Sequence, residues 1–180
     1  MGVATGRLKR WQAVLGGTAL MLAFVAVVLL LLVRQAGQWG VPYFSFTSAH
    51  GSPCRNDLIG YTCTPLTLAD IEFFGDVNLP NDATVVSGRY RATHDYQLDA
   101  QVKVPARSAA SALKRLTTAY GRCGPARPVL PMTGLRQVCV MATDDGASPT
   151  GEQPSSRIYS VATGVSKDGS RLVNLTVRSR

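Results

Sequence analysis

Apolar residues are unevenly distributed along the chain, with one dense block near the N-terminus and short alternating segments after it. The block covers residues 13–33 and contains no charged side chain. As an α-helix, a segment of this length rises about 30 Å, which is the thickness of the hydrocarbon layer of a bilayer. Trp11 and Trp39 flank the block, where indole rings favour the headgroup regions. The pattern therefore predicts one transmembrane helix over 13–33.

Basic residues near the block predict its orientation. Arg7, Lys9 and Arg10 precede it, whereas only Arg34 follows it closely. The positive-inside bias places residues 1–12 in the cytoplasm and everything after the helix outside, which makes the protein a single-pass plasma-membrane protein. A cleaved signal peptide is the alternative, but its apolar region usually has about 7–15 residues, and no A-x-A-like cleavage site follows the block. We predict an uncleaved signal anchor.

Beyond the block, the pattern changes to short periodic segments. Residues 34–53 are rich in Gly, Pro and Ser and predict a linker, which leaves residues 54–180 as the folded domain. Strict alternation over 96–104 predicts a half-buried strand, and β-branched residues predict another strand over 83–91. Residues 67–74 fit a short helix and a strand equally well.

The second half of the domain contains the clearest helical pattern. Apolar residues recur at helical spacing from Ala109 to Tyr120 within the segment 106–120, and Gly121 suits a C-terminal cap. This helix is predicted to pack on the sheet and to expose a basic outer face.

Three further strands are predicted after this helix. Residues 137–143 indicate a short buried strand, and 144–155 a loop rich in Gly, Pro, Asp and Ser. Residues 157–166 and 171–178 predict a hairpin, because an Asp-Gly pair between them favours a tight turn. The expected fold class is α+β: an N-terminal transmembrane helix followed by a small antiparallel sheet with one packed helix.

All four cysteines, Cys54, Cys63, Cys123 and Cys139, follow the predicted helix and are therefore expected outside the cytoplasm. An even number of cysteines in an exported domain predicts disulfides. Three connectivities are available, and we favour Cys54–Cys63 with Cys123–Cys139, because each pair closes a short loop. A zinc site is disfavoured, since the sequence has no C-x-x-C pair and its two histidines lack finger-like spacing.

The formal charge of +8 overstates the basic character of the domain. Four of the nineteen basic residues flank the helix and all eleven acidic residues follow it, so the remainder carries +4. A mild excess of this kind is usual for a solvated surface, and it also favours contact with anionic lipid or wall polymer. Such contact requires the basic residues around the predicted helix to gather on one face: Arg107, Lys114, Arg115 and Arg122. Because the basic residues are scattered, nucleic-acid binding is not expected.

No motif in the sequence indicates a catalytic or cofactor site. A catalytic base would have to be His50, in the linker, or His94, beside a turn, and neither place suits preorganisation. Acidic pairs occur at Asp70/Glu72 and Asp144/Asp145, where surface or loop roles are commoner than glycoside cleavage or calcium binding. We expect no cofactor and no metal.

The segment 79–116, LPNDATVVSGRYRATHDYQLDAQVKVPARSAASALKRL, resembles uncharacterised actinobacterial membrane proteins and lipoproteins of the cell envelope. In those proteins an L-P-x-x-A-T/S turn leads to a strand, an alternating strand that ends in Pro, and a short helix. The resemblance covers about a fifth of the chain. It implies a bacterial, envelope-facing α+β domain and provides no site residues.

These observations predict a membrane-anchored, extracytoplasmic, non-enzymatic binding module whose partner is an envelope protein. One alternative is an envelope hydrolase, which would need Asp70, Glu72 or Asp95 in a cleft with a raised pKa. The other is a module that binds wall polymer or anionic lipid through the basic residues. Ligand, biological process and oligomeric state are left open by the sequence.

Overall fold

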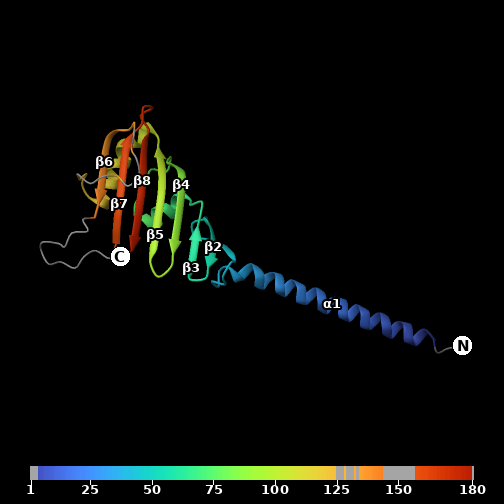
Figure 1. Ribbon diagram of the computed structural model, residues 1–180. Helices are drawn as coiled ribbons and strands as arrows, with labels where there is room; N and C mark the ends of the chain where they lie inside the picture. The colour runs from blue at the N-terminus through green and yellow to red at the C-terminus, as the bar shows by residue number, and fades with distance from the viewer. Residues whose placement is uncertain (1–3, 125–127, 129–131, 133, 144–156, 180) are drawn as a thin grey trace.

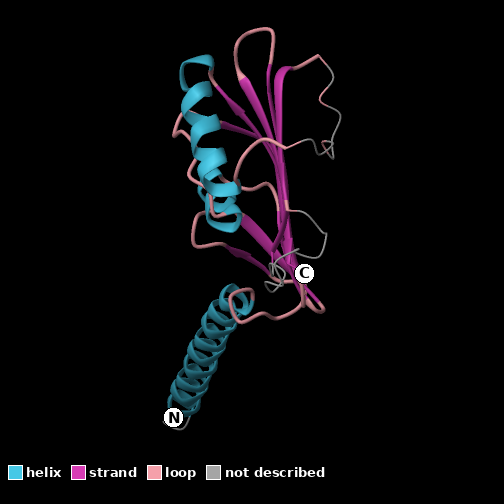
Figure 2. Cartoon of the chain, turned by 90° about the vertical axis from the view of Figure 1, so that its left-hand side faces the viewer, coloured by secondary structure: helices cyan, strands magenta, loops and turns pink. Residues whose placement is uncertain are grey.

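The computed structural model describes residues 4–124, 128, 132, 134–143 and 157–179. A long helix, α1 (Ala4–Ala36), leads into a domain made of one antiparallel sheet with two helices on one face (Figure 1, Figure 2). The strands are β1 (Ser45–Thr47), β2 (Pro53–Asp57), β3 (Gly60–Cys63), β4 (Thr84–Ala92), β5 (Tyr96–Val104), β6 (Arg136–Ala142), β7 (Arg157–Val165) and β8 (Arg171–Ser179). The helices of the domain are α2 (Leu68–Gly75) and α3 (Ala109–Tyr120), and a 3₁₀ turn, η1 (Ala106–Ser108), precedes α3. The predicted α+β class is confirmed.

The apolar part of α1, Gly16–Ala36, is long enough to cross a membrane, and only its last residue, Ala36, is buried. Figure 1 shows α1 projecting away from the sheet. The predicted span, 13–33, ends three residues earlier, because the helix continues through Arg34 to Ala36. The helix also begins at Ala4, so most of the predicted tail, 1–12, is helical.

The eight strands lie in the order β1-β2-β3-β4-β5-β8-β7-β6. The strands predicted over 83–91, 96–104, 137–143, 157–166 and 171–178 are confirmed as β4, β5, β6, β7 and β8. The predicted loop, 144–155, lies outside the described residues.

The centre of the sheet shows why the alternating pattern was informative. In the pairing of β5 with β8, Leu98 lies opposite Val177 and Val102 opposite Val173, and all four side chains are fully buried. The intervening polar residues of β5 therefore point to the opposite face. The sheet thus has a core face covered by α2 and α3, and a second face that we call the open face.

The segment 67–74, whose sequence pattern suited a helix and a strand equally well, forms the helix α2. Thr67 caps this helix by accepting a hydrogen bond from the backbone N–H of Asp70, and Asp76 ends it in a left-handed conformation. Ile71 is fully buried, so the helix contributes to the core. The sheet is therefore covered by two helices rather than by the single predicted one.

α3 confirms the amphipathic pattern. Its buried side chains include Ala112, Leu116 and Tyr120, and the Tyr120 hydroxyl donates a hydrogen bond to the carbonyl of Gly75 at the end of α2. Gly121 follows with a φ of 88°, a conformation that glycine adopts without strain.

The predicted linker, 34–53, is partly incorporated into the sheet. Its residues Ser45–Thr47 form β1 at the edge, paired with β2, and Ser52 is completely buried. The Gly and Pro content excludes a long central strand, but it permits a short edge strand held by its neighbour. The compact domain therefore begins before residue 54.

Both favoured disulfides are confirmed. Cys54–Cys63 joins opposite residues of β2 and β3, and Cys123–Cys139 joins the chain just after α3 to β6. The first crosslinks the small N-terminal strands, and the second fastens the helical layer to the far edge of the sheet.

Candidate functional site

Two of the four basic residues predicted as a binding surface form side-chain contacts within the domain. Arg107 forms an ion pair with Asp82, with Nε 2.7 Å from Oδ2, and the pKa of Asp82 is lowered by hydrogen bonds from Arg107 and Ser108. Arg115 donates to the Asn78 side chain and to the carbonyl of Leu79. These two arginines fasten the segment after α2 to α3.

The other two members of this set are exposed. Lys114 lines a shallow depression on the outside of α3 together with the acidic residues Glu72 and Asp76. Arg122 lies just after the helix. The outer side of α3 is therefore a surface of mixed charge.

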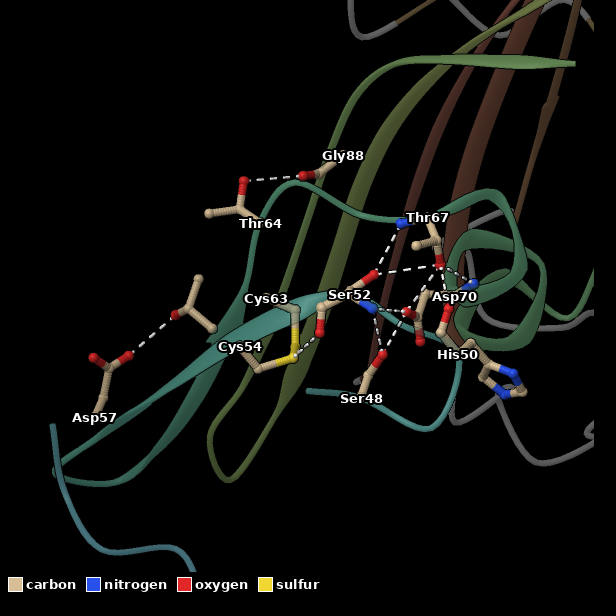
Figure 3. Close-up of a disulfide and its surroundings, with 11 residues drawn as sticks. Ser48, His50, Ser52, Cys54, Asp57, Cys63, Thr64, Thr67, Asp70 and Gly88 are labelled. Carbon is tan, nitrogen blue, oxygen red and sulfur yellow. Dashed lines mark hydrogen bonds between the residues drawn. A yellow bond between two sulfur atoms is a disulfide. The ribbon is translucent and has the colours of Figure 1, made fainter. Parts of the chain in front are cut away.

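Asp70, a buried acidic residue, is held in a hydrogen-bond network that joins two segments of the fold (Figure 3). Its side chain is buried, and Oδ2 accepts hydrogen bonds from the Ser48 hydroxyl at 2.6 Å and the Ser52 N–H at 3.1 Å. The Thr67 hydroxyl lies 3.1 Å from the same oxygen. Burial raises the pKa of Asp70, but these hydrogen bonds outweigh burial and leave it below the ordinary value. The network joins the β1–β2 connection to the start of α2.

The remaining candidates for catalysis are held in separate places. Glu72 accepts a hydrogen bond from the backbone N–H of Leu79. Asp95, in the β4–β5 turn, accepts one from the hydroxyl of Ser179 at the end of β8. His50 is exposed and packs on Phe73, and its ring points away from the Asp70 carboxylate in Figure 3. His94 is exposed in the β4–β5 turn. The structure does not bring these side chains together into one site.

The acidic pair Asp144/Asp145 lies outside the described residues. Among the residues that the structure describes, no three His, Cys, Asp or Glu side chains converge in a way that would hold a metal ion.

A charged surface that the sequence did not reveal lies on the open face. The pairing of five strands places one residue from each in a continuous row across β2, β3, β4, β5 and β8: Arg55, Thr62, Arg91, Gln97 and Arg178. Because neighbouring strands lie about 4.8 Å apart, the three arginines of this row recur roughly every 10 Å. Arg89, two residues before Arg91 on β4, is on the same face. We call these four exposed residues, Arg55, Arg89, Arg91 and Arg178, the arginine row.

The carboxylates near the arginine row accept hydrogen bonds from uncharged side chains. Asp57 accepts from the Thr62 hydroxyl at 3.1 Å, and Asp99 accepts from the Gln97 amide at 2.7 Å and the Thr176 hydroxyl at 3.0 Å. In the described part of the chain, the ion pairs are Lys103–Asp168, Arg107–Asp82 and Arg157–Asp76, and none of them includes the arginine row. The guanidinium groups therefore face solvent.

Two shallow depressions meet at Arg89. One is lined by Thr64, Asp99 and Gln101 on the β4–β5 side, and the other by Arg55 and Thr62 on the β2–β3 side. Neither is an enclosed cavity, so the surface suits a ligand that lies across the strands rather than a small molecule held inside the domain.

Comparison of the chain with protein-family models, curated proteins and solved structures found no significant match.

Proposed function

We propose that the protein is a membrane-anchored binding module that presents its open face, outside the cytoplasm, to an acidic protein of the cell envelope. α1 anchors the chain in the plasma membrane with the N-terminus inside. The basic residues before the apolar segment support this orientation, and so do the two disulfides, because such bonds persist in oxidising compartments. The resemblance of segment 79–116 to actinobacterial envelope proteins supports a bacterial envelope setting.

The arginine row carries the proposal. A guanidinium group offers paired N–H donors that match a carboxylate, and it is more weakly hydrated than an ammonium group, so it is well suited to ion pairs at interfaces. Four such groups with no ion-pair partner among the described residues stand on one face of a rigid sheet. A partner with acidic side chains at similar spacing would engage several of them together.

The hydrolase alternative gains no support from Asp70. That alternative needs a carboxyl with a raised pKa in a cleft, whereas Asp70 is buried among hydrogen-bond donors and has a lowered pKa. A linear anionic wall polymer would contact the same arginine row, and the experiment below separates it from a protein.

A photo-crosslinking residue at Gln97 tests the proposal, with the same residue at Ser111 as the matched control. Both positions are exposed, but Gln97 lies between Arg91 and Arg178 on the open face and Ser111 on the outer side of α3. In intact cells, illumination should give discrete protein adducts from position 97 and few from position 111. Identification of the adduct by mass spectrometry should show an acidic surface on the partner.

Charge reversal supplies the second arm of this experiment. Arg91→Glu with Arg178→Glu should reduce the adduct at least roughly tenfold, which corresponds to about 1.4 kcal/mol. Lys114→Glu with Arg122→Glu, which changes the net charge equally on the other side, should leave it unchanged. Equal adducts from positions 97 and 111, or insensitivity to R91E/R178E, would contradict the proposal. A smear of carbohydrate-containing adducts on the gel would identify the ligand as a wall polymer and overturn the protein partner.

A further inference from the structure

The domain is tied directly to the end of α1 by one residue of β2. The Asn56 side-chain amide donates hydrogen bonds to the carbonyl oxygens of Gly37 at 2.7 Å and Val41 at 3.1 Å. Its backbone accepts from the N–H of Tyr43 at 2.9 Å and donates to the carbonyl of Phe44 at 3.0 Å. Asn56 is buried, so these bonds are shielded from water. β2 therefore lies beside the domain end of α1, as Figure 1 also shows.

The β2–β3 hairpin ends in an unusual loop. Asp57 pairs with Gly60, so the loop consists of Leu58 and Ile59 alone, and their side chains are 72% and 64% exposed. Loops of this length usually contain Gly, Asn, Asp or Ser, whose backbone and hydrogen-bonding properties suit a tight turn. Two large apolar side chains at the tip contribute nothing to the core, so folding does not account for them.

Exposed apolar side chains are concentrated at this junction. Outside α1, the described residues include eight large apolar side chains that are exposed, and five of them lie here. We call these five the junction patch: Trp39, Val41, Tyr43, Leu58 and Ile59. The other three, Phe73, Val86 and Val138, belong to three different elements.

The backbone at the junction is strained in a way that keeps one of these side chains outside. Tyr43 has a φ of 68°, a left-handed conformation that costs a bulky residue free energy. The hydrogen bond from its N–H to Asn56 holds this conformation, and its ring is 62% exposed. The junction therefore presents an aromatic residue to its surroundings instead of burying it.

The dimensions of the junction match the headgroup layer. Gly37 follows Arg34 by three residues, and Leu58 follows Asn56 by two, which is roughly 7 Å of extended chain. The headgroup layer on each side of a bilayer is about 5–8 Å thick. If α1 spans the bilayer up to Arg34, the whole junction patch lies within or directly above this layer.

We propose that the junction patch is embedded in the headgroup layer of the outer leaflet, and that the Leu58–Ile59 loop inserts into the lipid as a second membrane contact beside α1. The proposal rests on the membrane anchoring proposed above, but not on the arginine row. Continuity with the span identifies the lipid surface as the occupant, and Trp and Tyr are the residues that favour this layer. A single helix can tilt in the bilayer and carry the attached domain with it, whereas a second contact fixes the angle of the sheet to the membrane.

Tryptophan fluorescence of the full-length protein in phosphatidylcholine vesicles tests this contact. The native indoles are removed by Trp11→Phe and Trp39→Phe, and one tryptophan is introduced by Leu58→Trp or, as the matched control, by Val86→Trp. Val86 is 55% exposed on β4, away from the junction. Lipids brominated on their acyl chains quench a nearby indole. The single variant Trp11→Phe, which keeps Trp39, reports the anchoring of α1.

Trp39 and the tryptophan of L58W should both be quenched and blue-shifted, whereas that of V86W should emit as in water. The proposal is overturned if L58W behaves as V86W while Trp39 is quenched. If Trp39 is not quenched either, the anchoring itself fails. Dilution of the protein in lipid excludes a second copy as the occupant: a blue shift of L58W that disappears on dilution would also overturn the proposal. Circular dichroism confirms that each variant is folded.

Discussion

At the scale of single residues, Asn56 is the clearest example of a side chain whose role depends on its position in the fold. One of its four hydrogen bonds reaches Gly37, at the end of α1 and nineteen positions earlier in the chain, and the other three hold the segment from Val41 to Phe44. Nothing in the local sequence marks it, because the asparagine lies between Arg55 and Asp57 in an ordinary polar segment.

Asn56→Ala should destabilise this junction. The substitution removes two side-chain hydrogen bonds, although the carbonyls of Gly37 and Val41 each keep a backbone N–H donor. A net loss of about 0.5–1.5 kcal/mol per hydrogen bond is therefore expected. In detergent micelles, limited proteolysis should cut faster between α1 and β1 in this variant than in the wild type. Asn81→Ala, at an exposed turn, serves as the control. Equal cleavage rates in all three proteins would show that Asn56 does not hold the junction.

Asp70 leads to a prediction about pH. Its folded-state pKa lies below the unfolded value, so the unfolded chain binds more protons in acid. The contribution of Asp70 is therefore complete above the unfolded pKa of about 3.9 and is lost as the pH falls through the folded pKa. Asp70→Asn should lower stability at neutral pH by about 1–3 kcal/mol, because an amide replaces the acceptor among hydroxyl and N–H donors.

The same variant should lose stability less steeply below about pH 4, although Asp82 and Asp168, whose pKa values are also lowered, keep part of the decline. Urea unfolding at several pH values measures both effects. A D70N protein with the neutral-pH stability and the acid dependence of the wild type would refute this account of the network.

The arginine row shows the limit of reading residues one at a time. Arg55, Arg91 and Arg178 come from three strands far apart in the sequence, and strand register alone aligns them. The sequence predicted the strand over 83–91 that carries Arg89 and Arg91, but not which residues of other strands lie beside them. The basic residues around α3 could be recognised from the local sequence, but Arg107 forms an ion pair with Asp82 and Arg115 donates to Asn78.

At the scale of elements, the sequence predicted those whose pattern is local and long. β5 alternates over nine residues, α3 keeps its helical spacing over three turns, and the β7–β8 hairpin has an Asp-Gly turn. β1, β2 and β3 have three, five and four residues, too short for periodicity to identify. α2 was ambiguous for the same reason, and its Thr67 cap and packing on the sheet decide it.

The two disulfides stabilise different elements. Each closes a short loop, of nine and sixteen positions, and the loop-entropy relation gives about 3 kcal/mol for each. Cys54→Ala with Cys63→Ala should raise hydrogen exchange in β2 and β3, whereas Cys123→Ala with Cys139→Ala should raise it at the end of α3 and in β6.

Hydrogen exchange followed by mass spectrometry distinguishes the two variants, each of which is the control for the other. Exchange that rises equally throughout the domain in both would show that the disulfides act globally and not on their own elements.

At the scale of the whole molecule, the chain combines an apolar helix, a junction patch and a disulfide-linked sheet whose open face carries the arginine row. The anchor and the disulfides were predictable, because length, charge bias and cysteine number are properties of composition and order. The arginine row was not predictable, because strand pairing gathers its residues. In the junction patch, Trp39 was expected at the headgroups from the sequence, whereas the place of Leu58 and Ile59 beside it depends on the fold. On these grounds we propose a domain held close to a lipid surface with its arginine row exposed to solvent.

The account requires the domain to lie outside the cytoplasm with both disulfides formed. The most direct test adds one free thiol, Ser111→Cys, at an exposed position of α3, and treats intact cells with a membrane-impermeant maleimide. The variant should take up one label per chain on intact cells, and the wild type none, even after lysis and denaturation. Four labels on the wild type should appear only after reduction. Labelling of S111C that requires lysis, or labelling of the unreduced wild type, would contradict the account.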